Sequence, residues 1–290
     1  MKASDREMRK KEKLRVELLI ATMHQKDDSI LNRMHVQSDA IVINQCEPFA
    51  WREFKRDSYR IRFLSCGERG VGLSRNTALM RAERDICLFS DDDLIYRDGY
   101  EEKIIQAFED FPEADVLVFN IQSIDNKKSR YQIQKPMRIR WFNFARYGAA
   151  RTAIRRTSIL QHHLSFSLLF GGGAQYSCGE DTLFLHDCLK AGLRIYAVPI
   201  TLADVDDSTS SWFRGYDEKF LMDRGALYRA MYHRMAFLQS LLYLLRHKKV
   251  WKEADSFIGA LRMMKKGIRD YTIHGGNLEK KEEAYCGSIP

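Results

Sequence analysis

Short apolar runs alternate with segments of helical spacing over the first two-thirds of the chain, and this alternation limits the choice of fold more than any other feature. Strands are predicted at residues 16–22, 40–44, 61–65, 86–89, 116–119, 151–155 and 194–198. Helices are predicted at 27–36, 99–110 and 179–190, and after the glycine loop at 67–72. Strands that alternate with helices form open, mostly parallel sheets covered by helices. We therefore predict an α/β fold with a Rossmann-like, mostly parallel central sheet flanked by helices.

Three consecutive aspartates, Asp91, Asp92 and Asp93, follow the predicted strand at 86–89. Adjacent like charges repel one another, so we expect a cation to neutralise them. Mg²⁺ and Mn²⁺ are the simplest candidates because hard divalent ions prefer carboxylate oxygens and often share them with substrate phosphates. In open α/β sheets the ligand crevice lies beyond the carboxyl ends of the strands, where these aspartates stand. A solvated acidic loop is the alternative that the triplet alone leaves open.

Two later acidic groups also have a structural and a functional interpretation. Glu180 and Asp181 begin the predicted helix at 179–190, where carboxylates commonly complement the helix dipole. The functional alternative is that one of them is a general base beside the glycine loop at 171–173. A further acidic group, with Asp204, Asp206 and Asp207, follows the last predicted strand, where it either caps a helix or supplies one carboxylate that completes a metal shell.

The glycine loop at 67–72 resembles phosphate-binding loops only poorly. It follows the third predicted strand, and no Walker lysine comes after it. The loop is followed by Arg75 and Asn76, which puts a cation and an amide near a helix N-terminus. The partial positive charge of such a terminus already favours an anion.

The composition limits the partner and the compartment. The 290 residues include 47 Lys and Arg against 39 Asp and Glu, a net charge of +8, which suits nucleotide phosphates, an acidic lipid surface or nucleic acid. The six cysteines have no metal-binding or disulfide spacing, which favours a reducing cytoplasm. No apolar stretch approaches the roughly 20 residues that cross a bilayer. We expect a cytoplasmic protein that is soluble or peripheral on the inner face of the cell membrane.

Four regions are expected along the chain: a polar N-terminal lead at 1–14, a catalytic domain at 15–215, a helical region at 216–273 and a loose tail at 274–290. Apolar residues of the helical region recur at intervals that place them on one helix face, namely Leu227, Met231, Met235, Leu238, Leu242 and Leu245. Cations flank this face, so it can lie on an anionic membrane. Alternatively, the face packs on the catalytic domain or on a second subunit of a homo-oligomer.

Five pieces, taken in order, resemble the family 2 glycosyltransferases with the GT-A fold over roughly residues 15–215. They are Ala21-Thr22-Met23-His24-Gln25, the stretch 70–78 (Gly-Val-Gly-Leu-Ser-Arg-Asn-Thr-Ala), the aspartate run, the stretch 179–185 (Gly-Glu-Asp-Thr-Leu-Phe-Leu) and the stretch 208–213 (Ser-Thr-Ser-Ser-Trp-Phe). The last piece and the helical end look most like enzymes that build bacterial capsular polysaccharide, exopolysaccharide or lipopolysaccharide.

This resemblance implies an inverting glycosyltransferase of the hexosyltransferase class. Its donor would be a nucleotide sugar, usually a uridine diphosphate (UDP) sugar, and its acceptor a hydroxyl of a glycan or a lipid-linked oligosaccharide. The donor residues that it implies are Thr22, His24, Gln25, Asn44, Arg75, Asn76, Asp91 and Asp92; relatives often carry aspartate in place of Asn44. Mn²⁺ or Mg²⁺ would be held by Asp93 with Asp91 and Asp206. Asp181 would be the general base, with Glu180 oriented toward the acceptor.

Two other classes remain open on sequence grounds. A phosphohydrolase or phosphotransferase could also bind Mg²⁺ through aspartates at a strand end, but the haloacid-dehalogenase pattern has Thr or Val where Leu94 follows here. A non-catalytic basic protein that binds nucleic acid or membrane would explain the charge. The sequence contains no helix-turn-helix, zinc finger or aromatic RNA motif, so we expect no nucleic-acid partner.

Overall fold

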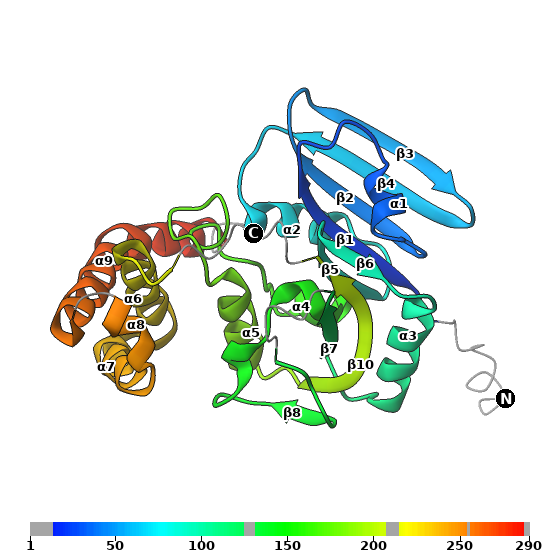
Figure 1. Cartoon of the computed structure of the whole chain (residues 1–290). Coiled ribbons are helices and arrows are strands. Elements are labelled where there is room, and N and C mark those ends of the chain that lie inside the picture. Colours follow the sequence, from blue (N-terminus) through cyan, green and yellow to red (C-terminus); the bar gives the residue numbers. More distant parts are fainter. Residues whose placement is uncertain (1–13, 125–130, 207–214, 254–255, 287–290) are drawn as a thin grey trace, which may run out of the picture.

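The computed structural model describes residues 14–124, 131–206, 215–253 and 256–286. One twisted sheet runs through the middle of the molecule, with helices packed against it and a separate group of C-terminal helices at one side (Figure 1). The strand order is β3-β4-β2-β1-β5-β9-β7-β10-β6, and β8 pairs with β10 off this path. The predicted α/β class, with a central sheet flanked by helices, is confirmed.

The first half of the sheet contains a group of parallel strands. They are β1 (Val16–Met23), β2 (Asp39–Gln45), β4 (Tyr59–Cys66) and β5 (Ile86–Asp91). β1 lies between β2 and β5, and β2 pairs in turn with β4. These strands are rich in aliphatic residues and largely buried, as expected where both faces of a parallel sheet are covered. The edge strand β3 (Ala50–Arg56) was not predicted, because its side chains are mostly charged or exposed.

The second half of the sheet is mixed. β7 (Val116–Ser123) and β10 (Ile195–Val205) are parallel, whereas β9 (Thr152–Arg155) runs antiparallel between β5 and β7. The short strands β6 (Leu94–Tyr96) and β8 (Met137–Ile139) pair antiparallel with β10. β10 continues beyond Pro199, where the prediction ended it. Its pairing shifts register between Ala197 and Thr201, and such an irregularity accommodates a proline within a strand.

In the described part of the sheet domain, the α-helices are α1 (Ile30–Arg33), α2 (Val71–Arg81), α3 (Tyr100–Asp110), α4 (Arg156–Gln161) and α5 (Glu180–Lys190). Alternate strand residues enter two different cores, as the period of a strand requires. In β1, Leu19 packs with residues of α2 and α5, whereas Leu18 and Ile20 pack with residues of α1 and α3. The helices therefore cover both faces and leave the strand ends for the loops.

The C-terminal elements are α6 (Glu218–Tyr232), the 3-10 turn η4 (His233–Met235), α7 (Ala236–Arg246), α8 (Lys248–Glu253) and α9 (Phe257–Cys286). α6 and α9 approach closely at two glycines: a Cβ on Gly225 would clash with the backbone of Met264, and one on Gly267 with that of Met222. α9 continues past residue 273 into the segment that was expected to be a loose tail. Among the described residues, no helix combines the length and the apolar character needed to cross a membrane.

The apolar face expected along one C-terminal helix is divided among α6, η4 and α7. His233 has a φ of 46°, which breaks the helix between α6 and α7. Leu227 and Met231 of α6 are buried in the main core, so the alternative of packing on the catalytic domain holds for this half. In contrast, Leu238 and Leu245 of α7 are 42% and 56% exposed.

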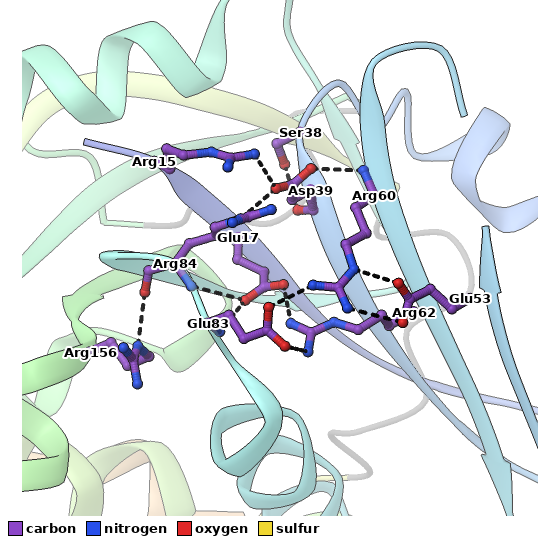
Figure 2. A network of polar contacts seen from close by, with 10 residues as sticks. All are labelled: Arg15, Glu17, Ser38, Asp39, Glu53, Arg60, Arg62, Glu83, Arg84 and Arg156. Carbon is purple, nitrogen blue, oxygen red and sulfur yellow. Dashed lines mark hydrogen bonds and ion pairs between the residues drawn. The ribbon is translucent and has the colours of Figure 1, made fainter. Parts of the chain in front are cut away.

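A network of charged side chains lies at the amino ends of the parallel strands (Figure 2). Glu17, the second residue of β1, and Arg62 of β4 form an ion pair in which both side chains are almost fully buried. Arg62 Nη1 also donates to Glu83 Oε1 at 2.9 Å, and Asp39 at the start of β2 accepts from Arg84 Nε at 2.6 Å. This network lies at the amino ends of the parallel strands, whereas Asp91 lies at the carboxyl end of β5.

Candidate functional site

The aspartate run lies where β5 ends and the chain turns into β6. Asp91 is the last residue of β5, and Asp92 and Asp93 form the turn before Leu94. The hydroxyl of Thr22, near the end of the neighbouring strand β1, donates a hydrogen bond of 2.5 Å to Asp92 Oδ2. Because β1 and β5 are adjacent and parallel, their carboxyl ends meet. The structure therefore brings predicted donor residues from both strands together.

Gln25 and Asn44 extend this group toward β2. Gln25 Nε2 donates to Thr22 Oγ1 at 2.9 Å. The backbone N–H of Gln25 donates to Asn44 Oδ1 at 3.0 Å, and Asn44 Nδ2 donates back to the Gln25 carbonyl oxygen at 2.9 Å. Asn44 is fully buried, and its amide also reaches Ser65 Oγ at 3.1 Å. The buried Asn44 side chain therefore fixes the backbone of Gln25 through two hydrogen bonds.

The glycine loop packs against the ends of β1 and β2. Gly70 N donates to Gln45 Oε1 at 3.0 Å, and Arg69 Nη1 lies 3.3 Å from Nε2 of His24. Arg69 is exposed, and it was not among the predicted site residues. Its place in the site depends on the packing of the glycine loop beside His24, which is 45 residues away in the sequence. It adds a cation to the side of the site where the predicted donor residues gather.

Arg75 joins the aspartate run to the acidic pair of α5. Its Nη2 donates to Asp91 Oδ1 at 2.8 Å and its Nη1 donates to Glu180 Oε1 at 3.0 Å. The side chain is only 4% exposed, and its guanidinium lies over the ring of Phe166, 5.3 Å from the ring centroid. Because both terminal nitrogens bind carboxylates, Arg75 holds the two acidic groups of the site in a fixed relation. This link spans 105 residues of sequence and was not predicted.

Glu180 and Asp181 form the first turn of α5, after Gly179 in the left-handed region at φ 115°. Burial, together with the neighbouring charge of Asp181, raises the pKa of Glu180 to about 7. Burial also raises the pKa of Asp181, against the opposing effect of Arg75. Carboxylates that titrate nearer to neutral pH are suited to proton transfer.

The two carboxylate oxygens of Asp181 have different surroundings. Oδ1 accepts from the backbone N–H of Thr182 at 2.7 Å. Oδ2 lies beside Gly148, where an added Cβ would be 3.2 Å away from it. Oδ2 is thus the carboxylate oxygen that borders the approach left open by the absent side chain of Gly148. A side chain at position 148 would narrow this approach.

Asp206 lies beside the aspartate run because β10, which it follows, pairs with β6. Val205 of β10 is opposite Leu94 of β6, and Asp206 N donates to the carbonyl oxygen of Asp93 at 3.3 Å. Over the described ranges, however, no three His, Cys, Asp or Glu side chains gather closely enough to hold a metal ion by themselves. The Ser-Thr-Ser-Ser-Trp-Phe piece at 208–213 lies outside the described residues.

The side chain of Asn76 binds the backbone of Phe166. Its Nδ2 donates to the carbonyl oxygen of Phe166, and its Oδ1 accepts from the N–H of Phe166, both at 2.8 Å. The Asn76 amide thus pairs with the backbone of the segment before the 171–173 loop. It supports the ring on which Arg75 lies.

The C-terminal helices hold the loop that leads to Asp181, and no sequence signal had indicated this. Asp223 of α6 is 1% exposed and accepts from Ser177 N at 2.8 Å and from Ser177 Oγ at 2.5 Å. The hydroxyl of Tyr176 donates to Asp270 Oδ2 of α9 at 2.8 Å. A Cβ on Gly179 would lie 2.9 Å from Leu227 of α6. The helical region is therefore part of the support of the site.

Comparison with known proteins gives a family match over the sheet domain. The model of glycosyl transferase family 2 matches residues 21–170, just over half of the chain. The matched range contains every predicted donor residue and ends before Glu180. A search of curated proteins found no match.

Solved structures resemble most of the chain. The crystal structure of residues 1–349 of TarS from S. aureus aligns with a TM-score of 0.57 and 14% identity, over 87% of this chain and 90% of that one. The same TarS fragment in complex with UDP-GlcNAc aligns with a TM-score of 0.57 and 13% identity, over 87% of this chain and 91% of that one. Its complex with UDP aligns with a TM-score of 0.56 and 14% identity, over 87% of this chain and 90% of that one. These likenesses show a shared GT-A fold.

Proposed function

Since this chain belongs to glycosyl transferase family 2 and has the GT-A fold, we propose that it transfers a sugar from a UDP sugar to a hydroxyl of a saccharide acceptor, with inversion at the anomeric carbon. The observation that carries the proposal is the Arg75 bridge between Asp91 and Glu180. The bridge joins the strand-end aspartates, on the side of the donor, to the acidic pair that would meet the acceptor. Both halves of a transfer reaction therefore share one site.

The donor would lie over the carboxyl ends of β1, β2 and β5. Thr22, His24 and Gln25 surround this position, and Arg69 offers an exposed cation for a diphosphate. Two TarS structures that share the fold contain UDP-GlcNAc and UDP, which supports a uridine nucleotide over other nucleotides. The net charge of +8 also favours an anionic substrate.

A divalent cation, Mn²⁺ or Mg²⁺, fits the residues present at the strand end. Carboxylate oxygens are the ligands that these ions prefer, and Asp206 lies next to the backbone of Asp93. We assign the ion to Asp93 and Asp206, with Asp91 adjoining. Mg²⁺ is commonly held by one or two carboxylates together with substrate phosphates and water, so a cage of three protein side chains is not required. When bound, the ion would stabilise the negative charge of the departing diphosphate.

Asp181 is the proposed general base. Its Oδ2 would take the proton of the acceptor hydroxyl while the hydroxyl oxygen forms its bond to the anomeric carbon. The bond from that carbon to the diphosphate oxygen breaks with its electron pair on the diphosphate. Attack from the face opposite the leaving group inverts the centre, and no covalent enzyme intermediate is needed. Arg75 and Glu180 would hold the base beside the donor.

A donor screen with a base variant tests the proposed activity. The protein is incubated with a panel of nucleotide sugars and Mn²⁺, and release of the free nucleoside diphosphate is measured. Asp181→Asn should bind the preferred donor as the wild type does, while turnover falls by about 10²–10⁴-fold. If no nucleotide sugar binds or is consumed, the proposed function is wrong. Loss of donor binding in Asp181→Asn would instead make Asp181 a structural cap or a metal ligand.

We further propose that the acceptor belongs to a bacterial surface polysaccharide and is a glycan or a lipid-linked saccharide. An acceptor on a lipid carrier would be reached most easily by an enzyme at the cytoplasmic face of the membrane. The exposed apolar side chains of α7 suit this location, and the exposed cations Arg246, Lys248 and Lys249 adjoin them. A helix with an apolar face and flanking cations can lie on acidic lipid, gaining about 1 kcal/mol per cation near the surface.

Liposome co-sedimentation tests the proposed docking. The protein should bind vesicles of phosphatidylglycerol and phosphatidylcholine at low salt but not vesicles of phosphatidylcholine alone. Reversing the charges of Lys248 and Lys249 to Glu should weaken this binding. The matched control is Lys55→Glu on β3, at the far edge of the sheet. Absence of binding at low salt would refute the docking, and a dimer in the ultracentrifuge would then assign α7 to contact between subunits.

A further inference from the structure

A small cavity borders Gly148, the glycine that lies against Asp181. It has a volume of about 210 Å³ and is lined by Ile121, Tyr131, Arg146, Gly148, Ala150 and Arg151. The lining comes from the end of β7, from Tyr131 in the connection after it, and from the turns η1 (Phe144–Arg146) and η2 (Ala149–Arg151) with Gly148 between them. Gly148 borders the cavity and also lies against Asp181 Oδ2. Gly148 is therefore a residue shared by the cavity wall and the surroundings of the proposed base.

The charged side chains that line the cavity are both arginines. Arg146 is exposed, and its guanidinium lies 4.8 Å from the centroid of the Tyr131 ring. It forms no ion pair with any residue in the described part of the chain. Stacking on an aromatic face restrains a guanidinium without using its N–H donors. Arg146 therefore presents a positioned cation whose N–H donors are not used by the stacking contact.

Arg151 fixes the walls around Arg146. It is only 9% exposed, and its Nη1 and Nη2 donate to the carbonyl oxygens of Tyr131 and Arg146, each at 3.0 Å. The guanidinium of Arg151 thus ties together two segments that are 15 residues apart in the sequence. The cavity is consequently built by internal contacts, with Arg151 as a support and Arg146 as the ligand-facing charge.

We propose that this cavity is an acceptor subsite that binds an anionic group, a phosphate or a carboxylate, of the saccharide acceptor. The planar fork of Arg146 matches the paired oxygens of either group. The partly exposed ring of Tyr131 offers an apolar surface to the carbons of the attached sugar. With the anion held there, a neighbouring hydroxyl would lie over Gly148 and meet Asp181 Oδ2. The inference rests on the proposed glycosyl transfer and narrows its acceptor to an acidic one.

Ligand-detected NMR with the full chain tests the subsite apart from catalysis. UDP and Mg²⁺ are present at saturation, so that the donor site is occupied. The probes are glycerol 3-phosphate and glucuronate, which separate a phosphate from a carboxylate, and glycerol and glucose serve as their neutral counterparts. At least one anionic probe should bind, and both neutral probes should bind about tenfold more weakly or not at all.

Two variants connect this binding to Arg146. Arg146→Gln should lower the affinity for the anionic probe about tenfold or more. Arg146→Lys keeps the charge but loses the planar fork, so its affinity for the probe should lie between those of Arg146→Gln and the wild type. The matched control is Arg138→Gln, because Arg138 is also an exposed arginine over a tyrosine ring, that of Tyr196, but lies on β8. Arg138→Gln should bind the probe as the wild type does.

The outcomes separate the subsite from the proposed function. Equal affinity of the anionic probe for the wild type and Arg146→Gln, or equal binding of neutral and anionic probes, overturns the subsite. UDP binding that persists in such a result leaves the proposed function standing. Failure of UDP itself to bind overturns the proposed function and, with it, the assignment of the cavity to an acceptor. With a transferable acceptor, Arg146→Gln should raise its KM and leave the KM of the donor unchanged.

Discussion

Replacing Arg75 by methionine should destabilise the protein to an extent that depends on pH. The variant keeps most of the length of the side chain but removes the guanidinium that holds Asp91 and Glu180. Removing one partner from a buried ion pair typically costs about 3–5 kcal/mol, because the other charge is left buried and unpaired. Arg75 is 4% exposed, so it belongs to this class of site.

Its two partners lower the expected cost. The Asp91 side chain is 41% exposed and can turn to water. Losing the Arg75–Asp91 ion pair should therefore lower the free energy of unfolding as little as losing a surface pair does, by about 1 kcal/mol or less. The Glu180 side chain is 13% exposed, but its pKa of about 7 lets it take up a proton instead of remaining charged. Arg75 lowers that pKa, so the variant should raise it further. We expect a loss of about 2–3 kcal/mol at pH 8, falling to about 1 kcal/mol at pH 6, where Glu180 is already largely protonated.

Urea unfolding at pH 6 and pH 8 measures both values. The double variant Arg75→Met/Glu180→Gln is the control, because it has no carboxyl group at position 180 to titrate. In this background the cost of removing Arg75 should be nearly equal at the two pH values. A loss that is the same at pH 6 and pH 8 in the single variant would refute the assigned coupling. A loss below about 0.5 kcal/mol at pH 8 would show that Arg75 does not hold a buried charge.

Four further predictions concern the rest of the site and its support. Asp93→Ala should abolish Mn²⁺-dependent binding of the nucleotide sugar, measured by calorimetry, and leave thermal unfolding of the metal-free protein nearly unchanged; wild-type transfer by this variant would refute the metal assignment. The raised pKa of Glu180 means that the wild type loses stability as pH rises from about 4.5 to about 7. Glu180→Gln should lack this loss, about 3 kcal/mol at most, when unfolding is compared at pH 5 and pH 8. Asp223→Ala should lower kcat by up to about 10²-fold without changing UDP binding, because it frees the loop before the base, and an unchanged kcat would count against that support. Arg62→Met should cost about 3–5 kcal/mol in urea unfolding by leaving Glu17 buried and unpaired, with donor KM unchanged, and a cost near zero would contradict the buried pair.

Local patterns predicted the central strands because those strands need no distant partner to be recognised. Aliphatic runs such as residues 16–22 and 40–44 are buried on both faces of the sheet, so their composition alone identifies them. The edge strand β3 escaped prediction for the opposite reason. It lies at the border of the sheet with most side chains exposed, and only pairing with β4 makes it a strand. The break at His233 was also missed, since helical spacing continues across it.

The site divides in the same way. The aspartate run and the Glu180-Asp181 pair stand out because adjacent carboxylates are costly without a partner, and both were predicted as site residues. Arg75 was selected as a cation near a helix start, but its actual partners are 16 and 105 residues away. The contacts of Asn76, Asp223 and Arg146 carry no local signature. Each of these side chains is an ordinary polar residue until the fold sets a particular neighbour beside it.

The sequence by itself determined the α/β class, the positions of the buried strands and the two acidic groups, because these depend on the composition and period of short segments. Tertiary structure alone decided the antiparallel insertion of β9, the Arg75 bridge, the hold of α6 and α9 on the loop before Asp181, and the cationic cavity beside it. These features join residues that are far apart in the chain. Their contacts exist only after the chain has paid the entropy of closing the intervening loops, and that closure is set by the packing of the whole fold.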